Sequence, residues 1–330
     1  MHTNKSRASF LTKWLRGSAI AGCVVWEAGF FWRSSSLIET ELINKILLLG
    51  VLVIVPLGLA LTPRNKAESE MATFRFAAIA QSIGAALVAG SFLFQQGTIA
   101  GLLAAAWLIV TGLTAIHGLA RVWKRETRTL EEVSVSAGLL FVLIGAGWLV
   151  LSRLGVQPLG FGDTIVLLTA VHFHYAGFAA PILAGLAGRT LMSQPKFAAP
   201  KIARRMFGFA VIGIVIGTPI VAAGITLSPR LGFAGTLIIS LALILLSIVS
   251  MGWVIPQINR KSAQLLLVIS ALSPFVSMVL ASLYSYSLAT KRLIIDIPQM
   301  AMTHGLVNAF GFALCGLIAW TLLNSERSSG

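Results

Sequence analysis

Runs of apolar residues, each long enough to cross a bilayer, follow one another along nearly the whole chain. A transmembrane helix needs about 20 predominantly apolar residues, and the polar segments between these runs are short. The pattern predicts ten spans: 17–32, 46–62, 76–94, 99–120, 134–152, 164–186, 207–226, 232–255, 263–288 and 298–322. The first is the shortest of them and contains Glu27.

The connectors are too short to form a soluble domain, so we expect one all-α integral membrane domain over residues 1–330. Ten spans place both termini on the same side of the membrane. They also divide into halves, 1–155 and 156–330, of opposite orientation, as in transporters built from inverted repeats. A 5+5 inverted repeat is therefore a hypothesis for this chain.

Composition agrees with the spans, because only 11% of the residues are charged and 57% are hydrophobic, with a mean hydropathy of +0.88. An ordinary soluble domain carries about 25% charged residues. The class predicted is a polytopic membrane protein.

The net charge of +14 follows the predicted topology. If successive connectors alternate sides, one side receives only six of the 25 Lys and Arg residues: Arg33, Lys45, Arg153, Arg230, Lys291 and Arg292. Basic residues of short loops stay in the cytoplasm, so both termini are predicted to be cytoplasmic. The basic excess then serves topology and contact with membrane lipids, and nucleic acid is not expected as a partner.

Several ionisable or polar residues interrupt the apolar runs, and the topology places most of them at similar depth in the outer half of the bilayer. The candidate proton- or substrate-binding residues are Glu27, His172, His174, Tyr175, His304 and Asn308. Ionisable groups inside a membrane are costly and usually functional. The simpler alternative is that each histidine is neutral and bonded to a neighbouring helix.

Helix geometry limits how these side chains can act together. At 100° per residue, His172 and His174 point about 200° apart, so a regular helix cannot aim both at one ion. His304 and Asn308 are four residues apart and share a face.

Three functions follow from these residues. The first is a proton-coupled carrier of a small solute or ion, because histidine titrates near neutral pH. The second is an intramembrane enzyme acting on a lipid or apolar substrate, with a divalent transition metal held by Glu27, His172 and His304; haem on a histidine pair is a variant. The third is a membrane scaffold without catalysis. No GxxxxGK[ST] loop is present, which argues against ATP-driven transport by this chain alone.

Three strings carry a family resemblance: LTAVHFHYAGFAAP at 168–181, GAGWLVLSRLG at 145–155 and LGFGD at 159–163. They resemble the YndJ-like family of bacterial membrane proteins, and THGLVNAFGF at 303–312 fits more loosely. The resemblance implies that His172, His174 and Tyr175 belong to a family motif. It also implies a multi-pass protein of the bacterial cytoplasmic (inner) membrane, and a transporter label is attached to the family without an established activity.

Overall fold

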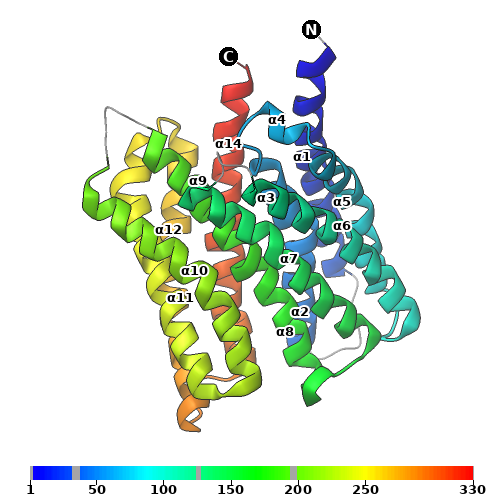
Figure 1. Ribbon diagram of the computed structural model, residues 1–330. Coiled ribbons are helices and arrows are strands. Elements are labelled where there is room, and N and C mark those ends of the chain that lie inside the picture. The colour runs from blue at the N-terminus through cyan, green and yellow to red at the C-terminus, as the bar shows by residue number, and fades with distance from the viewer. Residues whose placement is uncertain (1–2, 32–37, 124–127, 194–198, 330) are drawn as a thin grey trace. The chain divides into compact units, whose positions relative to one another are not determined.

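The computed structural model describes residues 3–31, 38–123, 128–193 and 199–329, and every regular element in these ranges is a helix (Figure 1). The chain forms two compact units. The first comprises the described residues of 1–127 and 136–179, and the second comprises 128–135 and 180–329. The division falls within helical stretches rather than in the loop near residue 155, and the inverted repeat stays a prediction.

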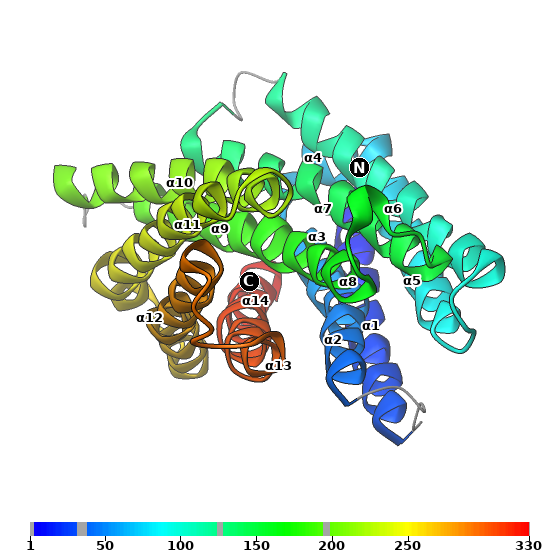
Figure 2. The ribbon, with the colours of Figure 1, turned by 90° about the horizontal axis from the view of Figure 1, so that it is seen from below.

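The first unit contains most of the N-terminal half of the chain. Its α-helices are α1 (Thr3–Phe31), α2 (Ile38–Leu49), α3 (Val55–Leu61), the single turn α4 (Lys66–Ser69), α5 (Ala72–Ser91), α6 (Thr98–Val122), most of α7 (Leu130–Leu154) and α8 (Asp163–His172). Two π-helical segments, Gly50–Ile54 and Phe173–Ala179, and a 3₁₀ turn, Pro158–Gly160, complete it. Within this unit α1 packs against α2, and α5 packs against α6 (Figure 2).

The second unit contains the beginning of α7 and the C-terminal helices. These are α9 (Ala180–Ser193), α10 (Lys201–Leu227), α11 (Pro229–Val249), α12 (Lys261–Thr290), α13 (Ile297–Met300) and α14 (Cys315–Ser329), with π-helical segments Ser250–Val254, Ala301–Gly305 and Val307–Leu314 and the 3₁₀ turn Ile255–Gln257. Helices α10 and α11 form a tight hairpin. The turn between them is short, because Pro229 begins α11 directly after Ser228, which has an extended backbone. The two helix backbones approach so closely at Gly224 and Gly232 that a Cβ added to Gly224 would overlap Gly232.

Nine helical stretches in the described ranges are long and apolar enough to cross a membrane: Thr40–Leu61, Ala72–Ser91, Thr98–Val122, Leu130–Leu154, Asp163–Ser193, Lys201–Leu227, Pro229–Gln257, Lys261–Thr290 and Ile297–Ser325. They correspond to the second to tenth predicted spans, which confirms an all-α polytopic membrane protein. The first predicted span, 17–32, lies largely in α1, a 29-residue helix that is not among the nine. Arg16 and Glu27 interrupt its apolar character.

Proline accounts for several of the wide helical turns. Three π-helical segments are each followed within two residues by a proline, namely Pro56, Pro181 and Pro256. A proline has no N–H to give to the carbonyl four residues earlier, and its ring pushes that carbonyl away, so the preceding turn is free to widen. The histidine motif at 172–175 therefore lies at a break in regular α-helix, which the assumption of a regular helix did not anticipate.

Candidate functional site

His174 lies at the centre of the first unit with both ring nitrogens engaged. Its side chain is fully buried. The indole Nε1 of Trp107 in α6 donates to His174 Nε2 over 3.0 Å, and His174 Nδ1 lies 2.8 Å from the carbonyl of Ala170. Nε2 accepts and Nδ1 donates, an arrangement that requires the neutral imidazole. His174 matches the simpler alternative of a histidine satisfied by a neighbouring helix.

The other residues of the motif attach the same segment to further helices of the first unit. The Tyr175 hydroxyl donates to the carbonyl of Ile46 in α2 over 2.9 Å. The ring of Phe173 packs edge-on against the ring of Phe141 in α7. The ring of Phe178 packs against Gly58 of α3 so closely that a Cβ added to Gly58 would lie 2.6 Å from Phe178 Cε1. The segment FHYAGF, residues 173–178, is thus a packing centre that contacts α2, α3, α6 and α7.

Glu27 and His172 are not drawn into that centre. Glu27 is exposed on α1, and in the described part of the chain it makes no hydrogen bond or ion pair. His172 is half-buried, and its ring lies against Phe173 with the ring centroids 5.7 Å apart. The expected association of Glu27 with the histidines stays a prediction.

His304 and Asn308 lie in the second unit and bond to each other and to α12. His304 Nδ1 is 2.8 Å from the carbonyl of Ser277, and the Asn308 amide donates to the His304 carbonyl over 3.0 Å. The Ser277 hydroxyl donates to Asn308 Oδ1 over 3.1 Å. The shared face predicted for His304 and Asn308 serves here to hold the π-helical segments against α12.

Metal binding has no preformed site within the described ranges, where no three His, Cys, Asp or Glu side chains are grouped closely enough to hold an ion. The residue set proposed from the sequence, Glu27, His172 and His304, therefore gains no support from the geometry as it stands. Tetrahedral metal sites need three or four such ligands around one centre.

The first unit contains a large cleft. Its volume is about 1560 Å³, and it lies between α1, α2 and α5 and the adjoining ends of α7 and α8. Small and apolar side chains form its walls, including Trp14, Ala21, Val25, Leu52, Ala85 and Ala89. Ligand pockets for small molecules usually measure about 300–1,000 Å³, so this cleft suits a larger, mostly apolar ligand.

The cleft runs along most of α1. Its lining residues on this helix extend from Phe10 to Gly29. At 1.5 Å per residue this wall is about 28 Å long, close to the roughly 30 Å thickness of a bilayer's hydrocarbon core. A ligand lying in the cleft could therefore extend across most of the hydrocarbon core.

Polar groups gather where α5 and α7 end and α2 and α8 begin. The lining residues there with charged or amide side chains are Glu41, Asn44, Lys45, Gln95, Gln96, Arg153 and Asp163, whereas Lys13 lies toward the opposite end of α1. The N–H of Gly97 donates to the carbonyl of Arg153 over 2.9 Å, which fixes the end of α7 against the turn after α5. The cleft is thus amphiphilic, with an apolar body and one strongly polar end.

Arg153 is the residue of this cleft whose importance the sequence analysis missed, because it counted there only toward topology. Its side chain is 7% exposed, and its guanidinium lies 4.5 Å from the ring centroid of Phe92. A signal was available: Arg153 directly follows the apolar run 134–152 and falls within the string GAGWLVLSRLG.

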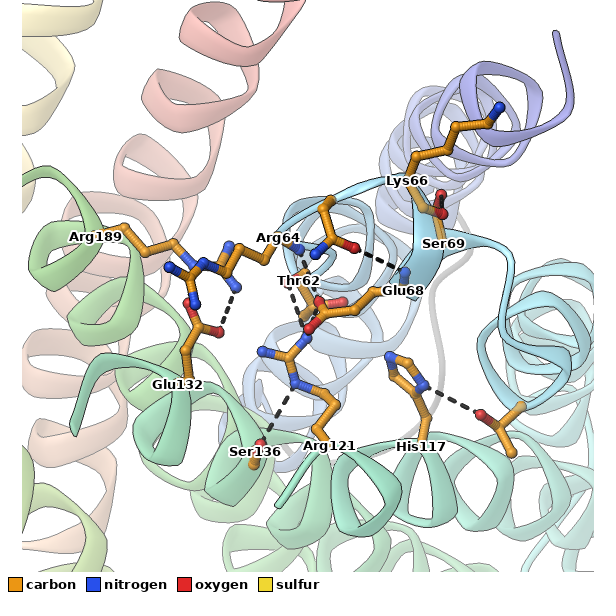
Figure 3. A network of polar contacts seen from close by, with 12 residues as sticks. Thr62, Arg64, Lys66, Glu68, Ser69, His117, Arg121, Glu132, Ser136 and Arg189 are labelled. Carbon is orange, nitrogen blue, oxygen red and sulfur yellow. Dashed lines mark hydrogen bonds and ion pairs between the residues drawn. The ribbon is translucent and has the colours of Figure 1, made fainter. Parts of the chain in front are cut away.

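Buried ion pairs near other helix ends also escaped the sequence analysis. In the first unit Arg121 of α6 is fully buried and its Nη1 lies 2.5 Å from Glu68 Oε2, with the Thr62 carbonyl and the Ser136 hydroxyl as further acceptors (Figure 3). In the second unit Arg189 Nε lies 2.8 Å from Glu132 Oε1. Both pairs join residues far apart in the chain, and we assign them to stability rather than to a site.

Comparison with known proteins identifies the family. The model of the YndJ-like protein family matches residues 45–312, which include the histidine motif and Arg153 but not α1. The uncharacterized membrane protein YndJ of Bacillus subtilis (strain 168) is 29% identical over 220 residues, and this match covers 67% of the present chain and 38% of that protein. No solved structure matches. The chain is a polytopic membrane protein that belongs to the YndJ-like family.

Proposed function

We propose that this protein is a membrane carrier whose cargo is a lipid-like amphiphile held in the cleft of the first unit. The observation that carries the proposal is the cleft itself, with about 1560 Å³ of volume and a wall on α1 from Phe10 to Gly29. A small solute or ion needs no cavity of this size. The apolar walls and the polar end match a molecule with a long apolar part and one head group.

The geometry favours this cargo over proton-coupled transport of a small solute through the histidines. Both nitrogens of His174 have partners inside the protein, so a proton could be exchanged there only after a hydrogen bond is broken. The candidate residues of the second unit also have hydrogen-bond partners in α12: His304 Nδ1 bonds the carbonyl of Ser277, and Asn308 Oδ1 accepts from the Ser277 hydroxyl.

Filling the cleft tests the proposal, and Gly90 of α5 offers a suitable position. Gly90 lines the cleft, and a Cβ added there would meet no atom within 4 Å. We expect the wild-type protein, purified in mild detergent, to retain about one lipid-like molecule per chain by native mass spectrometry. Gly90→Trp should lose that molecule.

A matched control is available on α6. Gly112 is half-buried like Gly90, its Cβ position is equally open, and it does not line the cleft. Gly112→Trp should keep the bound molecule. After reconstitution, wild type and Gly112→Trp should move a fluorescent lipid between leaflets faster than Gly90→Trp does. Equal lipid content and equal transfer in the two tryptophan variants would refute the carrier proposal.

A further inference from the structure

Arg153 provides an uncompensated positive charge at the polar end of the cleft. Its Nη2 donates to two neutral acceptors, the carbonyls of Ser91 at 3.0 Å and Phe94 at 2.7 Å. Its Nε is buried and has no hydrogen-bond partner. Within the described ranges no carboxylate lies at ion-pair distance from this guanidinium.

The acidic side chains that line the same end have other partners. Glu41 forms an ion pair with Lys45, four residues further along α2, with 2.6 Å between Glu41 Oε1 and Lys45 Nζ. Asp163 is exposed and accepts a hydrogen bond of 3.0 Å from the Gln157 amide. The charge of Arg153 is therefore not balanced locally, although burial makes an unpaired charge expensive.

The chemistry of the guanidinium indicates what would balance it. A planar guanidinium binds phosphate oxygens with two parallel hydrogen bonds and is less strongly hydrated than an ammonium group, which suits a half-apolar site. A free phosphate ion would occupy only a small part of the cleft. A phosphate attached to acyl chains would place its charge at Arg153 and its chains along the small residues Ala85 and Ala89 and the apolar wall of α1.

We propose that the cargo of the cleft is a phospholipid of the surrounding membrane, with its phosphate bound by Arg153 and its acyl chains along α1 and α5. This inference rests on the proposed carrier function and specifies its ligand. Arg153 belongs to the part of the chain that matches the YndJ-like family, whereas the α1 wall lies outside it. On this basis the head-group end of the site is carried by the family region.

The test compares two lipids that differ only in the head group. Fluorescently labelled phosphatidylglycerol and a diacylglycerol with the same acyl chains are titrated into the full-length protein in detergent. We expect phosphatidylglycerol to bind at least tenfold more tightly than the diacylglycerol. Arg153→Gln should reduce that preference to less than threefold, whereas Arg292→Gln, which removes an exposed cation in the second unit, should leave it unchanged.

The outcomes separate this inference from the carrier proposal. If both lipids bind equally to wild type and both are lost in Gly90→Trp, the cleft holds lipid but the phosphate assignment is wrong. If neither lipid binds in a manner sensitive to Gly90→Trp, the carrier proposal falls and this inference with it. The comparison within wild type needs no variant, so it tests the preference for a phosphate head group even if Arg153→Gln fails to fold. Displacement of the lipid by millimolar inorganic phosphate would also overturn the assignment, because it would mean that the chains contribute nothing.

Discussion

Trp107 donates its indole N–H to Nε2 of His174 over 3.0 Å, and the two rings are nearly parallel, with an interplanar angle of 14°. This bond joins α6 to the π-helical segment Phe173–Ala179. Because His174 Nδ1–H donates to the carbonyl of Ala170, the imidazole has no remaining hydrogen-bonding capacity. His174 and Tyr175 of the string HFHY are therefore explained within the first unit by packing and hydrogen bonding. The cleft lined by α1, α2 and α5 is the better candidate for ligand binding.

Removing both partners of this bond should cost less stability than the two single removals added together. Trp107→Phe leaves Nε2 of His174 buried without a donor, and His174→Phe leaves the indole N–H without an acceptor. Each should lower the free energy of unfolding by about 1–3 kcal/mol or more, and the double variant should cost less than the sum. Denaturation with SDS, followed by circular dichroism, measures the three values. Strict additivity would show that the bond contributes nothing.

Gly145 on α7 is required by the same histidine. A Cβ at position 145 would lie 2.9 Å from His174 Nδ1 and 3.0 Å from Phe173 Cβ. We expect Gly145→Ala to lower the free energy of unfolding by about 1–3 kcal/mol, the usual cost of overpacking. Gly147→Ala, two residues further along the helix, meets no atom within 4 Å and should be neutral or stabilising by up to about 1 kcal/mol. Equal effects of the two substitutions would contradict the close approach of α7 to His174.

The class of the protein and nearly all of its spans could be predicted from the sequence, because long apolar runs have one stable solution in a bilayer. The sequence also predicted a similar depth in the membrane for Glu27 and the histidines, which suggested that they act together. The position of each helix within the membrane plane could not be predicted, because a helix at a given depth can pack against any other helix. Trp107 as the partner of His174, and the cleft along α1, depend on lateral position. Arg153 shows the same limit, because its hydrogen bonds to the carbonyls of Ser91 and Phe94 depend on where the end of α5 and the turn after it lie.

The pair formed by Arg121 and Glu68 should be far more sensitive to substitution than a similar pair nearby. Arg121 is fully buried and the side chain of Glu68 is 4% exposed, so Glu68→Gln leaves a buried cation without its counter-charge (Figure 3). The expected loss of stability is about 3–5 kcal/mol. Lys66 Nζ lies 3.6 Å from Glu70 Oε1, and the two side chains are 46% and 34% exposed. Lys66→Gln should therefore lower the free energy of unfolding by at most about 1 kcal/mol. Unfolding in SDS distinguishes the two, and similar losses would mean that the Arg121 site is hydrated.

Gly311 allows the π-helical segment Val307–Leu314 to approach α12 in the second unit. A Cβ at this position would overlap the hydroxyl of Ser273, which donates to the carbonyl of Ile269 within α12. We expect Gly311→Ala to cost about 1–3 kcal/mol of stability in the wild type. In a Ser273→Ala background the overlapping oxygen is gone, so the same substitution should cost less than about 1 kcal/mol. An unchanged cost in that background would show that the penalty arises from the backbone at Gly311 itself, and that the packing of this segment against Ser273 is looser than described.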